Sequence, residues 1–261
     1  GVERGRQPGV GGDVGNEEDV SVVACAEKAV KARPTHGMAQ NSLGLLYKQK
    51  SLFKPAIVAF EKAVAIMPKT AAVHANLGMA YFRDGRVKDA ERSLEKAVEL
   101  APNDADMHAN LGTIKRQLKD IDGAILHLAL AAKSKPTDDL LQNNLAVAYR
   151  YAKRYPEAVA AFKRAIAINP NEANYHFNLG VLYRLQEDID SAIASYSEAV
   201  RLDPKLDKAW YDLGVMHRAN HDNEKAIASF EAYLKLIKGK DAKAEKSVRD
   251  QIEGLGGKKP K

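Results

Sequence analysis

Histidine readily holds a metal ion or exchanges a proton near neutral pH, and this chain spaces three of them regularly. His74 and His108 are 34 residues apart, and His176 follows at twice that interval. His217 and His221 have the i, i+4 spacing of two ligands on one helix face. Zinc needs each nitrogen at about 2.0–2.1 Å, whereas packed helices lie about 8–10 Å apart. We therefore interpret the three spaced histidines as packing residues, place His221 in a turn, and predict no metal or other cofactor.

Other side chains offer little reactive chemistry. Cys25 is the only cysteine, so an internal disulfide is excluded. The stretch "VVAC" (22–25) resembles a bacterial lipoprotein cleavage box, but the preceding "GNEED" is not the apolar stretch that such a box requires. We interpret Cys25 as a small packed residue in a helix. "GLGGKK" (254–259) lacks the spacing of a phosphate loop, and no nucleophile and base stand out. We predict that the chain is not an enzyme.

The histidine interval belongs to a repeat that runs along most of the chain. "HANLG" occurs at 74–78 and again at 108–112, and related words occur at the same step, such as "HFNLG" at 176–180 and "WYDLG" at 210–214. A constant step of this size indicates a stacked repeat array, and it leaves no insertion for a catalytic domain. The step is marked by one leucine in each repeat: Leu43, Leu77, Leu111, Leu145, Leu179 and Leu213.

Each repeat reads as two helices. With 37–70 taken as positions 1 to 34, positions 4, 7, 8 and 11 share one face of a first helix, and positions 20, 24, 27 and 28 share one face of a second. Position 8 is glycine or alanine and position 20 is always alanine, which predicts a close helix crossing. Position 24 is large and should fill the space beside it. Proline at position 32 ends the second helix.

These features resemble the tetratricopeptide repeat family, whose pattern is W-x2-L-G-x2-Y…A-x3-F…A…P over 34 residues. "WYDLGVMH", from Trp210, carries most of its opening words, and "LGLLY" (43–47) and "LGVLY" (179–183) carry Leu, Gly and Tyr. The resemblance implies an all-α fold, a right-handed superhelical solenoid of antiparallel helix pairs. It covers six full repeats and a partial N-terminal one.

The resemblance also gives a domain organisation. We expect a flexible N-terminal segment at 1–16, a partial repeat at 17–36 and six repeats at 37–240. A capping helix should follow at 241–255, with apolar residues at helical spacing to close the open end of the array. Residues 256–261 should form a basic tail.

In this family, positions 2, 5, 6, 9, 12 and 13 usually face a concave groove. Position 6 is an asparagine in four successive repeats, and an amide that both donates and accepts can grip a peptide backbone. The alternative is that each asparagine bonds to an adjacent repeat or to solvent. The predicted amide ladder consists of Asn76, Asn110, Asn144 and Asn178.

Position 12 is basic in five repeats, and arginine forks match carboxylates. The alternative here is a solvated helix face. Aromatic residues near both ladders are candidate anchors, although some of them could pack between repeats instead. The predicted basic residues are Lys48, Arg116, Arg150, Arg184 and Arg218, and the predicted anchors are Phe82, Tyr151, Phe177 and Tyr211.

The sequence thus predicts a non-catalytic scaffold that binds an extended or helical, acidic segment of a partner protein. The net charge of +6 agrees with an acidic partner. Two alternatives stay open: a bacterial envelope lipoprotein that assembles type IV pilus secretins, and the targeting arm of a larger enzyme such as a glycosyltransferase. We expect a monomer or weak homo-oligomer, no nucleic-acid partner, and membrane attachment only through a lipid. The cytoplasm is favoured, with the bacterial periplasm or outer membrane as the alternative.

Overall fold

A computed structural model describes residues 14–256, with side chains from residue 22 onward. This part of the chain holds fourteen α-helices and no strand, and the chain divides after Leu118 into two compact units, which we describe separately. Unit 1 contains α1 (Val14–Ala32), α2 (Gly37–Gln49), α3 (Phe53–Ile66), α4 (Ala71–Arg83), α5 (Val87–Leu100) and α6 (Ala105–Gln117). Unit 2 contains α7 (Ile121–Ser134), α8 (Asp139–Tyr151), α9 (Tyr155–Ile168), α10 (Ala173–Leu185), α11 (Ile189–Leu202), α12 (Asp207–Ala219), α13 (Asn223–Ile237) and α14 (Ala242–Gly254).

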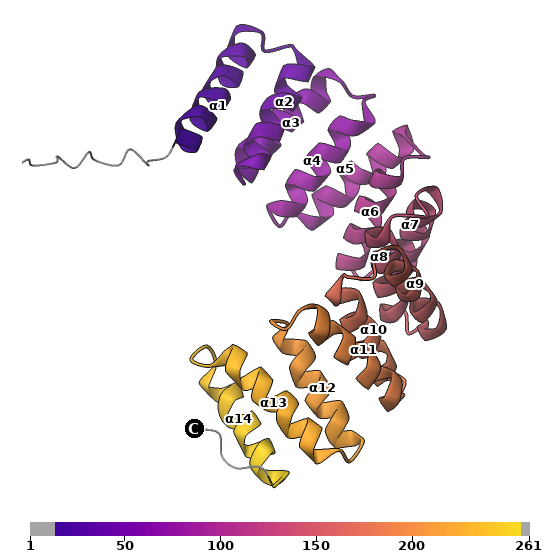
Figure 1. The fold of residues 1–261 in the computed structure, drawn as a ribbon. Coiled ribbons are helices and arrows are strands. Elements are labelled where there is room, and N and C mark those ends of the chain that lie inside the picture. Colours follow the sequence, from indigo (N-terminus) through magenta and orange to yellow (C-terminus); the bar gives the residue numbers. More distant parts are fainter. Residues whose placement is uncertain (1–13, 257–261) are drawn as a thin grey trace, which may run out of the picture. The chain divides into compact units, whose positions relative to one another are not determined.

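The predicted fold class is confirmed. All helices after α1 are 13 to 15 residues long. Within each unit, consecutive helices pack as antiparallel pairs, such as α4 with α5 and α10 with α11, and successive pairs stack on one another (Figure 1). The apolar face of each helix is therefore buried against the other helix of its repeat and against the adjacent repeats, as a helical solenoid requires.

The turn between the two helices of each repeat has one recurring backbone feature. Position 15 adopts a positive φ in all six repeats, which reverses the chain in few residues. Only the second repeat uses glycine there, and the others hold an L-residue in a conformation that disfavours it. The residues are Ser51 (φ 58°), Gly85 (84°), Lys119 (66°), Lys153 (58°), Glu187 (62°) and His221 (60°), so the turn predicted at His221 is present.

The helix crossing predicted at positions 8 and 20 is as close as expected. A Cβ placed on Gly78 would lie 2.7 Å from Cγ of Leu94 and 3.1 Å from the carbonyl oxygen of Ala90. A Cβ on Gly180 would likewise meet the ring of Tyr196 at 2.7 Å. The side chains at positions 20 and 24 are completely buried in every repeat. The glycine thus makes room for the large residue that fills the crossing.

The spaced histidines have a more specific role than packing alone. His74 Nε2 lies 2.8 Å from the carbonyl oxygen of Pro68, the proline that ends the preceding repeat. A carbonyl can only accept, so Nε2 donates. The same link is made by His108, His176, Trp210 and Gln40, to Pro102, Pro170, Pro204 and Pro34. Position 4 is therefore a donor that ties each of these repeats to the one before it.

Unit 1 has a second link between repeats, from position 11 to position 25 of the preceding repeat. Tyr81 donates to Glu61 at 2.6 Å, and Lys115 contacts Glu95 and Glu91, each at 2.7 Å. Burial and the bond to Glu61 raise the pKa of Tyr81 to about 12. These bonds help to fix the stacking of repeats that also share an apolar core.

The two ends of the array are helical. Helix α1 begins at Val14, inside the segment predicted to be flexible, and the rest of that segment lies outside the described residues. Cys25 is exposed on α1 rather than packed, which corrects our expectation for its side chain. At the other end, Val248 and Ile252 of α14 are buried against α13. Of the predicted basic tail, only Gly256 is described. The assignment of α14 as a cap stays a proposal.

Candidate partner-binding site

The four asparagines of the predicted amide ladder are not equivalent. In unit 1, Asn76 Nδ2 donates to Asn41 Oδ1 at 3.0 Å. In unit 2, Asn178 Nδ2 donates to Asn143 Oδ1 at 3.3 Å. In both cases position 6 of one repeat bonds to position 5 of the repeat before it. These two amides join repeats together, which is the alternative that the sequence had left open.

Asn110 and Asn144 differ because the residue at position 5 of their preceding repeat is alanine. Ala75 and Ala109 have no polar group to accept a bond. Both asparagines are half-buried, and neither side chain makes a hydrogen bond to another residue in the described range. The identity of position 5 is thus the sequence signal that separates linking amides from available ones, and our sequence analysis missed it.

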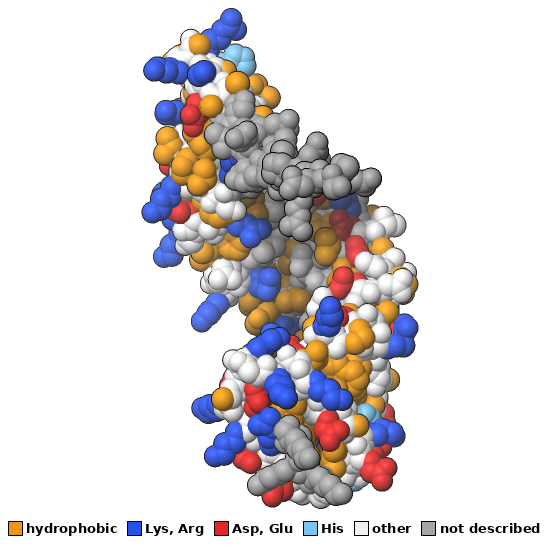
Figure 2. Space-filling model, turned by 60° about the vertical axis from the view of Figure 1, so that its left-hand side comes forward, with side chains coloured by type: hydrophobic (Ala, Val, Ile, Leu, Met, Phe, Trp, Pro, Cys, Tyr) orange, Lys and Arg blue, Asp and Glu red, His pale blue; other side chains and the backbone are white. Residues whose placement is uncertain are grey.

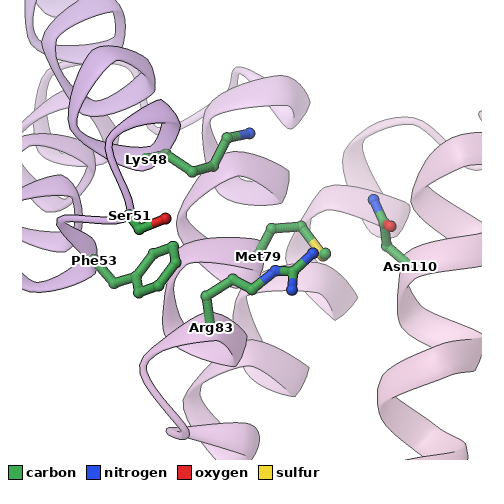
Figure 3. Close-up of a pocket in the computed structure, with 6 residues that line it drawn as sticks. All are labelled: Lys48, Ser51, Phe53, Met79, Arg83 and Asn110. Carbon is green, nitrogen blue, oxygen red and sulfur yellow. The ribbon is translucent and has the colours of Figure 1, made fainter. Parts of the chain in front are cut away.

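Asn110 lines a pocket of about 580 Å³ in unit 1. Lys48 comes from α2, Met79 and Arg83 come from α4, and Phe53 begins α3. Figure 3 shows the Lys48 and Arg83 side chains extending into the space between the helices, with Asn110 across from them. The pocket thus brings together a predicted basic residue and a predicted amide that are far apart in sequence. The full lining is Lys48, Ser51, Phe53, Met79, Arg83 and Asn110.

This lining has a clear chemical bias. It offers two cations, one amide and one hydroxyl over an apolar base of Phe53 and Met79, and none of its residues is acidic. Arg83, at position 13, was not among the predicted residues. Basic and acidic side chains are interspersed over the face shown in Figure 2, so the excess positive charge is not gathered into one patch there. The pocket instead brings two basic side chains together with no acidic residue in its lining.

The predicted arginines lie in different environments. The Arg150 guanidinium is over the ring of Tyr151, 5.4 Å from its centroid, and Tyr151 is 57% exposed. Arg218 Nη1 donates to Gln251 of α14 at 2.8 Å, so it helps to hold that helix. Arg116 is half-buried on α6. Arg116 lies in unit 1 and the other predicted arginines lie in unit 2, and their neighbours differ from one residue to the next.

Arg184 is exposed, but its guanidinium also has buried polar neighbours. Its guanidinium lies near Asp212, which occupies position 6 of the last repeat, and near the Tyr196 hydroxyl. The Tyr196 hydroxyl is buried and makes no hydrogen bond to either of these two residues. Burial raises the pKa of Asp212, and the charge of Arg184 partly opposes the rise. Burial, together with Asp212, also raises the pKa of Tyr196.

The remaining aromatic candidates pack partly into the cores. Phe82 is half-buried and packs against the core of unit 1. Phe177 lies against Tyr196 with ring centroids 5.8 Å apart. Tyr211 lies against Phe230 and Tyr233 at 5.9 and 5.3 Å. Phe177 and Tyr211 nevertheless keep exposed surface and line a second pocket, in unit 2.

No metal centre or membrane segment is seen in the part of the chain that the structure describes. No three His, Cys, Asp or Glu side chains within it come together as metal ligands. None of its helices is both long and apolar enough to cross a bilayer.

Comparison with known sequences decides the family. Two models described as tetratricopeptide repeat match residues 143–207 and 186–243 and residues 53–114, together more than half of the chain. The chain belongs to the tetratricopeptide repeat family. No curated protein sequence matches it significantly. As a tetratricopeptide repeat protein it is, in coarse terms, a protein-interaction scaffold, because stacked repeats of this kind offer extended binding surfaces.

Solved tetratricopeptide repeat structures share its fold. The C-terminal part of a repeat protein from Cytophaga hutchinsonii has a TM-score of 0.70 at 18% identity, covering 88% of this chain and 94% of that one. PilF from Pseudomonas aeruginosa has a TM-score of 0.68 at 19% identity, covering 82% and 97%. YrrB, described as having an unusual peptide-binding site, has a TM-score of 0.63 at 20% identity, covering 72% and 96%. Identities this low establish the fold alone.

Proposed function

We propose that this protein is a non-catalytic scaffold whose unit 1 pocket binds a carboxylate-bearing, extended segment of a partner protein. One observation carries the proposal: Lys48, Arg83 and Asn110 line one pocket that has no acidic residue. Arginine pairs with a carboxylate through two parallel donors, and lysine supplies a point charge. The amide of Asn110 could bond the partner's backbone beside them.

The charge preference can be tested with a fluorescein-labelled twelve-residue peptide of Glu, Asp, Ser and Gly. Its matched control replaces each Glu and Asp by Gln and Asn. We expect the acidic peptide to bind at least five-fold more tightly at low salt. The double variant Lys48→Gln/Arg83→Gln should remove that preference, as measured by fluorescence anisotropy. Because exposed charges act over a Debye length of about 10 Å at 0.1 M salt, the preference should shrink as salt is raised.

A matched control separates the pocket from net charge. Lys54 and Lys62 are exposed on α3 and do not line the pocket. The double variant Lys54→Gln/Lys62→Gln removes the same charge and should change affinity less than two-fold. Equal losses in the two double variants would mean that the peptide senses only overall charge, and the proposed site would then be wrong.

The role of Asn110 has its own test. The variant Ala75→Asn places an acceptor where Asn41 serves Asn76, so the introduced amide should occupy Asn110. Loss of one hydrogen bond of about 1 kcal/mol should weaken peptide binding about five-fold, and Asn110→Ala should do the same. Binding by Asn76→Ala should be unchanged, since that amide already bonds to Asn41. Unchanged affinity in both position-110 tests would remove Asn110 from the site.

The two alternative functions, pilus secretin assembly and enzyme targeting, have no support from particular residues in the described part of the chain. Fold similarity to PilF does not favour the first of them at this level of identity. The proposal therefore rests on the unit 1 pocket alone.

A further inference from the structure

Unit 2 holds a pocket of about 340 Å³ whose chemistry is opposite to that of the unit 1 pocket. Phe177 comes from α10, Tyr233 comes from α13, and the remaining lining residues come from α12. Ligand pockets usually span about 300–1,000 Å³, so this one suits a single side chain better than a larger group. The lining consists of Phe177, Asp207, Lys208, Tyr211, Asp212 and Tyr233.

Four of these residues break the repeat pattern at the same place. Position 27 is alanine in the first five repeats and tyrosine only at Tyr233. Position 5 is aromatic only at Phe177 and Tyr211, and position 6 is acidic only at Asp212. The first four repeats have no aromatic residue at position 5 and no tyrosine at position 27, so the repeat pattern itself does not require these residues. Their convergence on one pocket indicates a local binding site rather than a general feature of the array.

The aromatic walls are held in place by the core behind them. Phe177 packs on Tyr196, and Tyr211 packs on Phe230, with both supporting side chains fully buried. Tyr211 and Tyr233 are tilted by 55° at 5.3 Å between ring centroids. A site whose walls are already ordered loses little conformational entropy when it binds a ligand.

Negative charge predominates around the pocket. Asp207 and Asp212 line the pocket, and Asp241 lies near Tyr233. The basic groups are Lys208, which also lines the pocket, and Arg184, which lies beside Asp212. One Asp207 oxygen accepts the Lys208 backbone N–H at 2.7 Å, which leaves the other for a ligand. Aromatic faces beside carboxylates attract cations, because the ring quadrupole and the carboxylate charge act in the same direction.

We propose that this pocket binds an arginine side chain of a partner protein. A planar guanidinium can stack on an aromatic ring while its donors pair with a carboxylate, which the compact ammonium of lysine cannot do equally well. The site lies in unit 2 and selects the opposite charge, so it goes beyond the proposed function and does not depend on the carboxylate pocket of unit 1.

The test uses a capped peptide, Gly-Ser-Ala-Arg-Ala-Ser-Gly, titrated into isotope-labelled full-length protein and followed by NMR. Matched peptides carry Lys, Gln or Glu in place of Arg. We expect saturable shifts at the amides of Tyr211, Asp212 and Tyr233, at least three-fold weaker binding for Lys and at least ten-fold weaker for Gln. Equal binding of the Gln peptide would overturn the site. Lysine binding as tight as arginine would overturn the assignment to arginine.

Three variants locate the interaction. Tyr233→Ala restores the residue used by the other repeats, so it should fold, and it should weaken the arginine peptide at least ten-fold. Asp207→Asn keeps shape, removes one charge and should weaken binding at least three-fold. Lys208→Gln removes a competing cation and should strengthen binding about two-fold. Unchanged affinity in both Tyr233→Ala and Asp207→Asn would place the arginine elsewhere and overturn the proposal.

A control variant on α13, the helix that carries Tyr233, guards against indirect effects. Glu224 is exposed in the first turn of α13 and does not line the pocket. The variant Glu224→Gln also removes one negative charge and should leave the arginine peptide within two-fold of wild type. Weakening equal to that of Asp207→Asn would show attraction to net charge only and overturn the pocket. Because this assay uses a basic peptide, its failure is distinguishable from failure of the acidic-peptide test.

Discussion

At the scale of single residues, the donor at position 4 is a link between repeats. His74→Phe keeps the ring and much of the volume but removes the donor to Pro68. We expect it to lower the free energy of unfolding by about 1–3 kcal/mol, because a carbonyl in a part-buried site loses its partner. Urea unfolding measures this. His74→Gln retains a donor of the kind used by Gln40, so it should cost less than His74→Phe, and equal losses would contradict the hydrogen-bond role.

A buried histidine also predicts how stability depends on pH. His217 is 8% exposed, and burial lowers its pKa from the ordinary 6.5, with Asp222 opposing and Lys225 reinforcing the shift. As the pH falls below 6.5, the unfolded state gains a proton that the folded state does not bind, so stability is lost in that window. We expect His217→Gln to lose less free energy of unfolding than wild type between pH 7.5 and pH 5.5.

The neighbouring His221 supplies the control for that experiment. It is exposed in the turn after α12. Denaturation of His221→Gln at both pH values should give the same pH dependence as wild type. If His221→Gln rather than His217→Gln flattened the dependence, burial of His217 would not be its cause.

At the scale of elements, the positive φ at position 15 should limit the stability of the turn between the two helices of each repeat. Glu187 has φ 62°, and an L-residue there costs about 1–2 kcal/mol. Glycine avoids that strain but loses about 0.5–1 kcal/mol through the entropy of the unfolded chain. We therefore expect Glu187→Gly to raise the free energy of unfolding by up to about 1 kcal/mol in thermal or urea melts.

The second repeat offers the reverse substitution. Gly85 has φ 84°, and nothing lies within 4 Å of an added Cβ. Gly85→Ala therefore tests the backbone alone and should destabilise the protein. Stabilisation by Gly85→Ala, or destabilisation by Glu187→Gly, would mean that turn geometry is not limiting.

At the scale of the whole molecule, stability should be the sum of neighbouring repeat interactions, so a local defect should stay local. Gly78→Leu adds a branched side chain at the crossing with Leu94 and Ala90 and should cost about 1–3 kcal/mol. Hydrogen exchange with mass spectrometry should show faster exchange in α4, α5 and their neighbours, with α10 to α13 close to wild type. Uniformly faster exchange along the chain would indicate one cooperative unit instead.

The sequence by itself determined the repeat and its helix pairs. The 34-residue step, the i, i+3, i+4 apolar faces and the proline at position 32 are local properties, and local contacts suffice to specify helices and their ends. The close crossing at Gly78 could also be predicted, because a glycine inside a helix is costly unless packing requires it.

Only the tertiary structure decided which polar side chains bond to a neighbouring repeat and which line a pocket. Asn76 and Asn110 occupy the same repeat position, the third residue of "HANLG" in each case, yet Asn76 is bonded to Asn41 and Asn110 lines a pocket. The difference arises from residues about one repeat earlier, Asn41 and Ala75, and it appears only when stacking brings positions 5 and 6 together. The same holds for Arg83 beside Lys48, since side chains from different helices share a pocket only through the packing of those helices.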